Sequence, residues 1–230
     1  MDFIKNNIDN VLNRIRTAEK KANVEPNSVK LLAVSKTMPN EYVKIAIDCG
    51  LKEFGENYIQ EGIQKAELFQ DYATWHFIGH LQKNKVKLAV AHFDVIQTID
   101  SLDLAEKISR VAVELGRKLD VFIEVHFGDE STKTGFLPEE AEKNAQKIAC
   151  LENINLKGLM TIPPLTDNPN DNRCHFETLR NMSERIFKGC NFKPVLSMGM
   201  TADLEVAISE GSNMVRVGTG IFGPRNLKNK

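Results

Sequence analysis

The sequence has few cysteines, and their spacing suits neither a disulfide framework nor a zinc site. Cys49, Cys150, Cys174 and Cys190 lie far apart along the chain, whereas metal-binding cysteines usually come in close pairs. We therefore expect four reduced thiols. The five histidines are scattered as well, and no pair has the spacing of helical metal ligands. A metal site is not expected.

Long apolar runs and a net charge are also missing. No apolar run approaches the ~18 residues of a membrane-spanning helix, and the first seven residues lack the apolar core of a signal peptide. The 30 basic and 31 acidic residues nearly cancel, so no long-range field favours nucleic acid or an anionic membrane. These absences predict a soluble, cytoplasmic protein with no nucleic-acid and no membrane partner.

The sequence does contain a regular alternation of short apolar runs and longer helical patterns. After an amphipathic helix over residues 3–23, strands are expected near 30–35, 53–55, 75–78, 95–98, 121–125, 156–161, 195–197 and 214–217. Seven helices are expected between these eight strands, near 41–49, 58–69, 83–91, 102–115, 138–150, 173–188 and 203–210.

This alternation predicts an α/β protein in which residues 1–230 form a single-domain (β/α)8 TIM barrel. An open, doubly wound sheet would show the same alternation. Two observations favour the barrel. The first strand is not followed by a G-x-G-x-x-G turn, and a barrel of about 250 residues would use nearly the whole chain.

One apolar run ends at a single lysine. The run Leu31–Ser35 leads directly to Lys36, and Met38 and Pro39 follow. Desolvation beside apolar neighbours lowers the pKa of a lysine, which supplies the neutral amine that a carbonyl cofactor needs. Lys36 is therefore a candidate Schiff-base nucleophile. The alternative is a surface lysine that merely ends a strand.

Two later segments have the composition of a phosphate site. Residues 197–203 run from a strand through a turn to the start of a helix, and residues 216–220 follow the last strand with small residues. Loops after strands seven and eight of a barrel frequently bind phosphate. Taken singly, each segment could be an ordinary turn.

In a closed barrel the first and last strands are neighbours, so Lys36 would face both segments. Pyridoxal 5′-phosphate is a ligand that needs an amine and a phosphate cradle together. Its ring nitrogen would meet Arg216, which can only donate and so keeps that nitrogen unprotonated. A structural ion pair is the other interpretation of Arg216. The phosphate would be held by Ser197, Thr201, Gly218 and Thr219.

Seven blocks carry a resemblance to a known family. They are residues 33–36, 54–58, 75–82, 131–135, 158–160, 196–200 and 216–219. In these blocks the sequence resembles the pyridoxal phosphate homeostasis protein family, which is itself similar to the N-terminal barrel of alanine racemases of fold-type III. The resemblance implies a cofactor carrier or buffer that affects vitamin B6 and amino-acid balance, and it adds Asn57 and His76 to the pocket.

Some positions depart from the pattern of that family. Glu124 and His126 stand where glutamine and asparagine are more usual, and they would add titratable groups near the pocket. Thr201 and Gly220 replace a serine and an alanine. Lys133, in the block 131–135, is either a surface lysine or a second participant in cofactor exchange.

Racemisation would require two bases on opposite faces of the cofactor. Lys36 can be one. In alanine racemases the other is a tyrosine of a second domain, for which this sequence offers no segment, and Tyr42, Tyr58 and Tyr72 do not follow strands at the expected mouth. We therefore expect a protein that binds pyridoxal 5′-phosphate and stores it or delivers it to apo-enzymes, without robust turnover.

Two alternatives remain open at the level of sequence. One is a pyridoxal-phosphate-dependent amino-acid enzyme, such as a slow racemase. The other is a sugar-phosphate enzyme with a barrel fold, in which Lys36 would be incidental. The three hypotheses differ in whether the protein turns yellow with the cofactor and whether it then turns over an amino acid.

Overall fold

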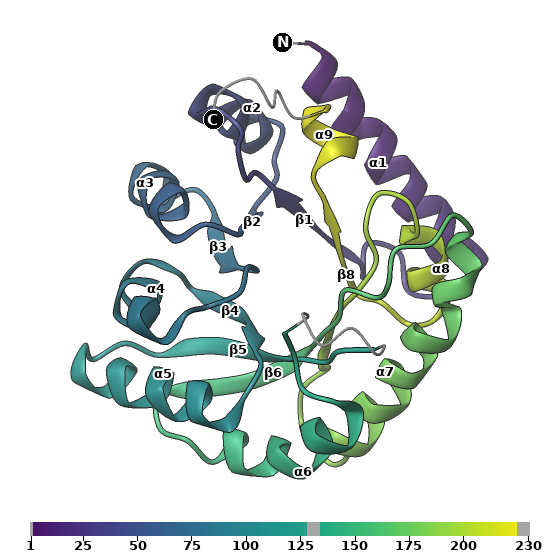
Figure 1. The fold of residues 1–230 in the computed structure, drawn as a ribbon. Coiled ribbons are helices and arrows are strands. Elements are labelled where there is room, and N and C mark those ends of the chain that lie inside the picture. The colour runs from purple at the N-terminus through teal and green to yellow at the C-terminus, as the bar shows by residue number, and fades with distance from the viewer. Residues whose placement is uncertain (1, 128–133, 225–230) are drawn as a thin grey trace.

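The computed structural model describes residues 2–127 and 134–224. Eight parallel strands close into a barrel in the order of the sequence (Figure 1). The first strand pairs with the second and with the eighth, which closes the sheet and excludes the open, doubly wound alternative. The strands are β1 (Lys30–Val34), β2 (Glu53–Glu56), β3 (Thr74–Phe77), β4 (Val95–Ile99), β5 (Leu119–Glu124), β6 (Ile154–Met160), β7 (Val195–Ser197) and β8 (Met214–Val217).

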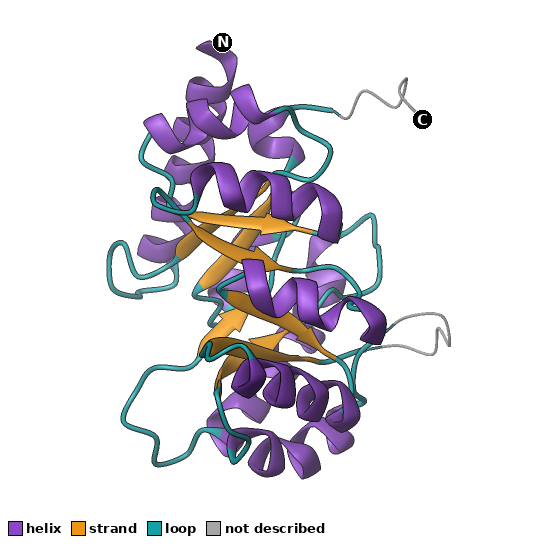
Figure 2. Ribbon diagram, turned by 90° about the vertical axis from the view of Figure 1, so that its left-hand side faces the viewer, coloured by secondary structure: helices purple, strands orange, loops and turns teal. Residues whose placement is uncertain are grey.

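The helices form a ring around the barrel, as Figures 1 and 2 show from two directions. None of those in the described part of the chain is long and apolar enough to cross a membrane. They are α1 (Asp2–Lys21), α2 (Asn40–Asp48), α3 (Ile59–Phe69), α4 (Val86–His92), α5 (Leu102–Glu114), α6 (Pro138–Ala149), α7 (Arg173–Ile186), α8 (Leu204–Ser209) and α9 (Thr219–Phe222).

The strands are apolar on both faces because both faces are covered. Successive side chains of a strand point to opposite faces. In β1, Leu31 and Ala33 belong to the large cluster that packs against the helices, whereas Leu32 belongs to a separate, smaller cluster. That smaller cluster fills the barrel interior, with Ile78, Val95, Phe122, Met160 and Met214 as its other buried members. The barrel is thus a packed core and not a pore.

Helix α1 lies outside the barrel, beside α8 and α9 (Figure 1). Its buried residues recur at helical spacing, which is why the sequence indicated one amphipathic face. Two polar side chains fix it in place. Asn7 donates to the carbonyl of Ile221 (2.9 Å), and Arg14 donates to the carbonyl of Thr201 (2.9 Å). The first helix therefore holds both loops that follow β7 and β8.

Three short elements differ from the expectation. The helix expected near residues 83–91 begins as a 3-10 turn, Lys83–Lys85, before α4. A second 3-10 turn, Pro169–Asn172, lies inside the proline-rich loop after β6. Helix α9 was not predicted, because four residues are too few to show helical periodicity.

Candidate functional site

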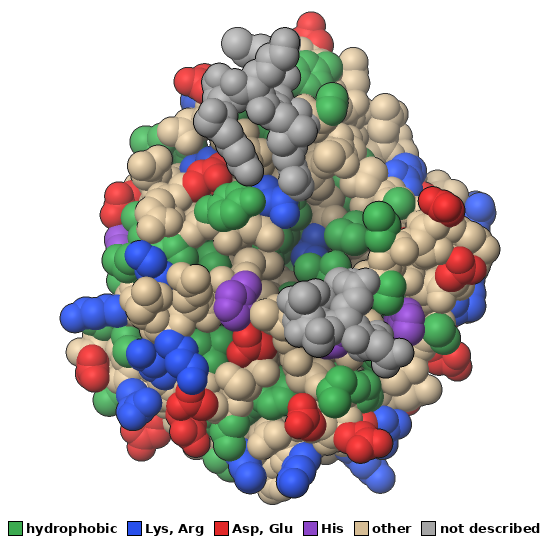
Figure 3. All heavy atoms as spheres, viewed as in Figure 1, with side chains coloured by type: hydrophobic (Ala, Val, Ile, Leu, Met, Phe, Trp, Pro, Cys, Tyr) green, Lys and Arg blue, Asp and Glu red, His purple; other side chains and the backbone are tan. Residues whose placement is uncertain are grey.

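A cavity of about 270 Å³ lies where β1, β2 and β8 end, close to the ~300 Å³ at which small-molecule sites begin. Six of the residues that the sequence suggested line it together: Lys36, Asn57, Thr201, Arg216, Gly218 and Thr219. The rest of the lining is mostly apolar, from Val34, Ile78, Ile162, Met200 and Ala202. In Figure 3 the face is hollowed near its centre, with blue atoms, which belong to Lys or Arg side chains, at the bottom of the hollow.

Larger hollows exist on the outside of the molecule. One of about 450 Å³ lies between α1 and α8, and one of about 570 Å³ lies between α6 and α7. Neither lies at the carboxyl ends of the strands, where barrel enzymes place their chemistry. The cavity beside Lys36 is therefore distinguished by its residues and position, and not by its size.

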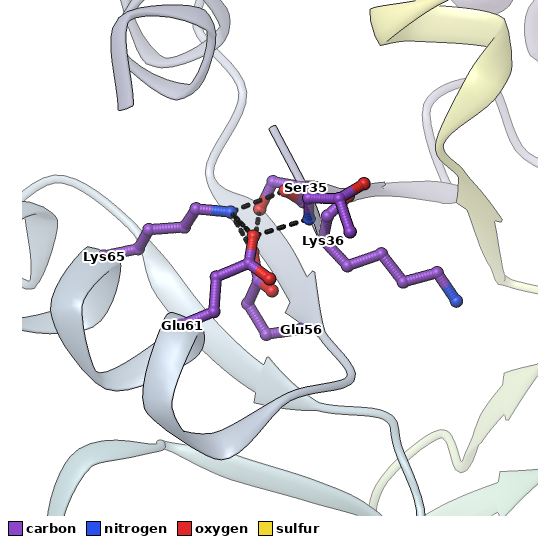
Figure 4. A network of polar contacts seen from close by, with 6 residues as sticks. Ser35, Lys36, Glu56, Glu61 and Lys65 are labelled. Carbon is purple, nitrogen blue, oxygen red and sulfur yellow. Dashed lines mark hydrogen bonds and ion pairs between the residues drawn. The ribbon is translucent and has the colours of Figure 1, made fainter. Parts of the chain in front are cut away.

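Lys36 comes two residues after the end of β1. Its side chain points away from a largely buried group of ionic residues that lies on the other side of the chain (Figure 4). That group consists of Glu56, Glu61 and Lys65. Thr37 has a φ of 64°, in the left-handed region that residues with a side chain rarely adopt. The chain thus turns sharply immediately after Lys36.

Arg216 is buried and held by neutral oxygens. Its Nη1 donates to the carbonyl (2.6 Å) and the hydroxyl (2.8 Å) of Ser197, and its Nη2 donates to the carbonyl of Thr161 (2.7 Å). Burial lowers the pKa of Arg216 to about 10, although the charges of Asp203 and Glu124 oppose this. The guanidinium is therefore cationic at neutral pH. Of its five N–H groups, those not used in these bonds can serve a ligand.

Ser197 and His76 are not among the residues that line this cavity. Ser197 lies behind Arg216: it accepts a hydrogen bond from Arg216 and donates one to Gln97 Oε1 (2.7 Å). Gln97 Nε2 in turn lies 2.8 Å from His76 Nδ1. His76 Nε2 lies 2.8 Å from Glu53 Oε2. His76 lines a different cavity, with residues such as Lys30 and Glu53 from the amino ends of the strands.

These bonds form one chain through the barrel interior, from Glu53 to Arg216. An amide NH2 can only donate, so Nδ1 of His76 must accept from Gln97, and its Nε2–H then donates to Glu53. Each bond consequently has a fixed direction. Ser197 thus holds Arg216 directly, and His76 is linked to Arg216 through Gln97 and Ser197.

Glu124 and His126, which depart from the family pattern, lie at the end of β5 and are buried. Burial and the nearby charge of Asp100 raise the pKa of Glu124 to about 7, although Arg216 and Thr134 oppose the shift. Among the described residues, His126 Nε2, Thr161 Oγ1 and Asn57 Oδ1 are buried with no hydrogen-bond partner. This end of the barrel therefore holds polar atoms that a ligand could satisfy.

Sequence reasoning missed Gln97 and Lys65. Both are polar residues inside a strand or helix, where a polar residue usually faces solvent, and neither forms a motif. The apolar residues Val95, Ile96 and Ile99, which surround Gln97 in the sequence of β4, were the one available signal. Lys133 lies outside the described residues.

Comparison with known proteins identifies the family. The model of the alanine racemase N-terminal domain matches residues 7–226. A relative from Aquifex aeolicus, named pyridoxal phosphate homeostasis protein, is 42% identical over 220 residues, which cover 95% of this chain and 96% of the relative. A relative of the same name from Escherichia coli K12 is 38% identical, and the match covers both chains completely. The chain belongs to the pyridoxal phosphate homeostasis protein family.

Solved structures agree with this family assignment. A protein of Bifidobacterium adolescentis is 39% identical with a TM-score of 0.89, over 96% of this chain and 95% of that one. PipY of Synechococcus elongatus, solved with PLP bound, is 34% identical with a TM-score of 0.78, over 91% and 99%. An alanine racemase of Clostridium difficile, at 19% identity and a TM-score of 0.79, shares the fold across 99% of this chain and 58% of its own.

Proposed function

We propose that this protein binds pyridoxal 5′-phosphate through a Schiff base on Lys36 and stores it or delivers it to apo-enzymes, without robust turnover of its own. One observation carries the proposal. A lysine, a buried arginine and a group of small and hydroxyl-bearing residues line a single cavity at the carboxyl ends of the strands. The name of the relatives and the PLP bound to PipY support the same ligand.

The residues present fit this cofactor. When bound, it supplies an aldehyde, a ring nitrogen that can accept a hydrogen bond, and phosphate oxygens. The cavity offers an amine for the first and guanidinium N–H groups for the second. Asn57 Oδ1 lines the cavity and is buried without a partner among the described residues. A Cβ at Gly218 would come 3.2 Å from the carbonyl oxygen of Val34, so a small residue keeps this wall close to the backbone.

We assign the phosphate to Thr201, Gly218 and Thr219. Thr219 begins α9, and the first N–H groups of a helix have no acceptor within the helix, so they are available to phosphate oxygens. The hydroxyls of Thr201 and Thr219 add donors. In this proposal Ser197 and His76 contribute to binding through Arg216, because their own side chains are engaged in the interior chain of hydrogen bonds.

Storage or delivery is favoured over turnover by what surrounds Lys36. Tyr58 and Tyr72 are 54% and 59% exposed, and neither these nor Tyr42 are among the residues that line the cavity. Racemisation needs a second base opposite the lysine. Lys36 has no tyrosine of the described chain facing it across the cavity.

The first experiment is to add pyridoxal 5′-phosphate to the purified protein and record the near-ultraviolet and visible spectrum. We expect a yellow Schiff-base band in the wild type and none in Lys36→Ala. Lys44→Ala, which removes an exposed lysine of α2, should keep the band. A band that survives in Lys36→Ala would contradict the assignment of the lysine.

A second experiment separates a carrier from an enzyme. The loaded protein is mixed with an apo-enzyme, and recovery of that enzyme's activity measures transfer of the cofactor. The same preparation is screened against a panel of amino acids for product or loss of optical activity. We expect transfer and no robust turnover. Turnover that Lys36→Ala abolishes would instead support the slow racemase.

A further inference from the structure

Lys65 of α3 is a buried lysine that the cofactor site does not use directly. Its side chain is 3% exposed, and its Nζ lies 2.8 Å from Glu56 Oε1 and 2.6 Å from Glu61 Oε1 (Figure 4). Burying such charges costs free energy that their attraction only partly returns, and well-packed apolar residues often do as well. The attraction among Lys65, Glu56 and Glu61 thus does not account for this cluster, and its role depends on the other residues that it contacts.

Those contacts fall on both neighbours of Lys36. On one side, Lys65 Nζ donates to the carbonyl of Ser35 (2.6 Å), and the hydroxyl of Ser35 donates to Glu56 Oε1 (2.7 Å). On the other side, the backbone N–H of Thr37 donates to Glu61 Oε1 (2.5 Å). Three segments that are separate in sequence, at the ends of β1 and β2 and within α3, meet at this point.

The bond to Thr37 has a particular consequence for the backbone. A left-handed conformation is unfavourable for a residue with a side chain, because its Cβ comes too close to the following carbonyl oxygen. Thr37 adopts it with a φ of 64°. A charged acceptor on its N–H compensates for such a cost, because hydrogen bonds to charged groups are stronger than neutral ones. The turn after Lys36 is thus held from one side by Glu61 and from the other by Lys65.

We propose that Lys65, Glu56 and Glu61 form a backbone clamp that positions Lys36 for bond formation with the cofactor aldehyde. This inference rests on the proposed function. In that step the neutral amine nitrogen attacks the aldehyde carbon, a C=N bond forms, and the aldehyde oxygen leaves as water with the two amine protons. Holding the nucleophile in the correct place accelerates such a step. Lys65 and the two glutamates are positioning residues, since they act through the backbone on either side of Lys36.

The test compares two ligands. Pyridoxal 5′-phosphate can form the C=N bond, whereas pyridoxine 5′-phosphate carries a hydroxymethyl group in place of the aldehyde and cannot. The rate at which the Schiff-base band appears and the dissociation constant of each ligand are measured for the wild type and for Glu61→Ala. We expect the band to appear about 10- to 100-fold more slowly in Glu61→Ala, with the affinity for pyridoxine 5′-phosphate changed by less than about twofold.

Two further variants sharpen the result. Glu61→Gln keeps an oxygen that can accept from the N–H of Thr37, so it should recover much of the rate. Glu41→Ala removes an exposed glutamate of α2, outside the cluster, and should behave as the wild type. Lys65→Met removes the central charge, and circular dichroism and thermal unfolding establish whether it is folded. If it is not folded, the Glu61 variants still decide the question.

The outcomes distinguish the clamp from the function on which it rests. A wild-type rate in Glu61→Ala, or an equal loss of affinity for both ligands, would overturn the clamp and leave cofactor binding intact. No band in the wild type, or a band that persists in Lys36→Ala, would overturn the proposed function and the clamp with it.

Discussion

Arg216 is a cation inside the barrel whose hydrogen bonds go to neutral oxygens. Serine and threonine carbonyls and one hydroxyl accept from it, whereas buried charges are usually paired directly with an opposite charge. Asp203 and Glu124 act on it as charges. An anionic ligand in the neighbouring cavity would offset the positive charge, which is one physical reason for a phosphate-bearing molecule to bind there.

Glu124 provides a pH-dependent prediction. Because burial raises its pKa to about 7 in the folded protein, from ~4.3 in the unfolded chain, the folded state holds the proton more tightly. The free energy of unfolding should therefore fall as the pH rises from about 4.5 to 7, by up to about 3 kcal/mol, and this contribution should then stay lost above pH 7.

The prediction is checked by denaturant unfolding at pH 5 and pH 8. Glu124→Gln, which does not titrate, should be less sensitive to this change than the wild type. Glu25→Gln, at an exposed position, should keep the wild-type difference. If Glu124→Gln and the wild type lose equal stability between the two pH values, the carboxyl does not have a raised pKa.

At the residue level, the sequence was most informative where chemistry coincides with the end of a strand. Lys36 and Arg216 were recognised because each interrupts or ends an apolar run, and the structure brings both to one cavity. Gln97 and Lys65 could not be found in this way. Their roles depend on partners distant in sequence, such as Ser197 for Gln97 and Ser35 for Lys65, which only the folded chain brings together.

At the level of elements, the position of His76 was only partly predictable, because it too depends on residues distant in the sequence. The alternation in β3 places Trp75 and Phe77 among the residues that pack against the helices, so an inward His76 could be predicted. The height of His76 along the barrel axis could not be predicted. His76 is in register with Val95, the first residue of β4, and so it lies near the amino ends of the strands. This height depends on the stagger of the strands in the closed barrel, and the local sequence does not determine that stagger.

Gly158 shows how closely two of the strands approach. A Cβ at this position would lie 2.1 Å from the carbonyl oxygen of Val195 in β7, which is backbone and cannot rotate away. We expect Gly158→Ala to lower the free energy of unfolding by about 1–3 kcal/mol or more, by separating β6 from β7. Chemical denaturation of the purified variant measures the effect.

Gly116→Ala is the matched control for that experiment. A Cβ there would meet nothing within 4 Å, and its φ is +62°, so only the left-handed penalty of roughly 1–2 kcal/mol applies. Because β7 carries Ser197, Gly158→Ala should also weaken cofactor binding, which Gly116→Ala should not. If both variants weakened cofactor binding equally, the close packing of β6 against β7 would not be the cause of the weaker binding.

At the scale of the whole molecule, binding of the cofactor should stabilise the fold. A ligand that binds only the native state at 100 times its dissociation constant contributes about 2.7 kcal/mol, which corresponds to roughly 5–10 °C in Tm for a chain of this size. Thermal unfolding with and without pyridoxal 5′-phosphate measures the shift. Lys36→Ala should lose most of it, and an unchanged Tm in the wild type would contradict binding to the folded barrel.

The barrel itself was the most predictable part of the molecule. Eight apolar runs of strand length, separated by amphipathic helices, have few ways to bury both faces of each strand, and the pairing of β1 with β8 confirms the closed solution. Helix α9 and the 3-10 turns were beyond prediction because short helices depend on the packing around them.

The position of α1 affects how the protein is made. Its partners at Thr201 and Ile221 are 187 and 214 residues away from Arg14 and Asn7 in the sequence. On a ribosome that adds ~5–20 residues each second, this first helix would wait roughly 10 to 40 seconds before α8 and α9, which cover part of its apolar face, are synthesised. Newly synthesised chains are therefore exposed to aggregation for most of translation, and a chaperone that shields the nascent helix should increase the yield of folded protein.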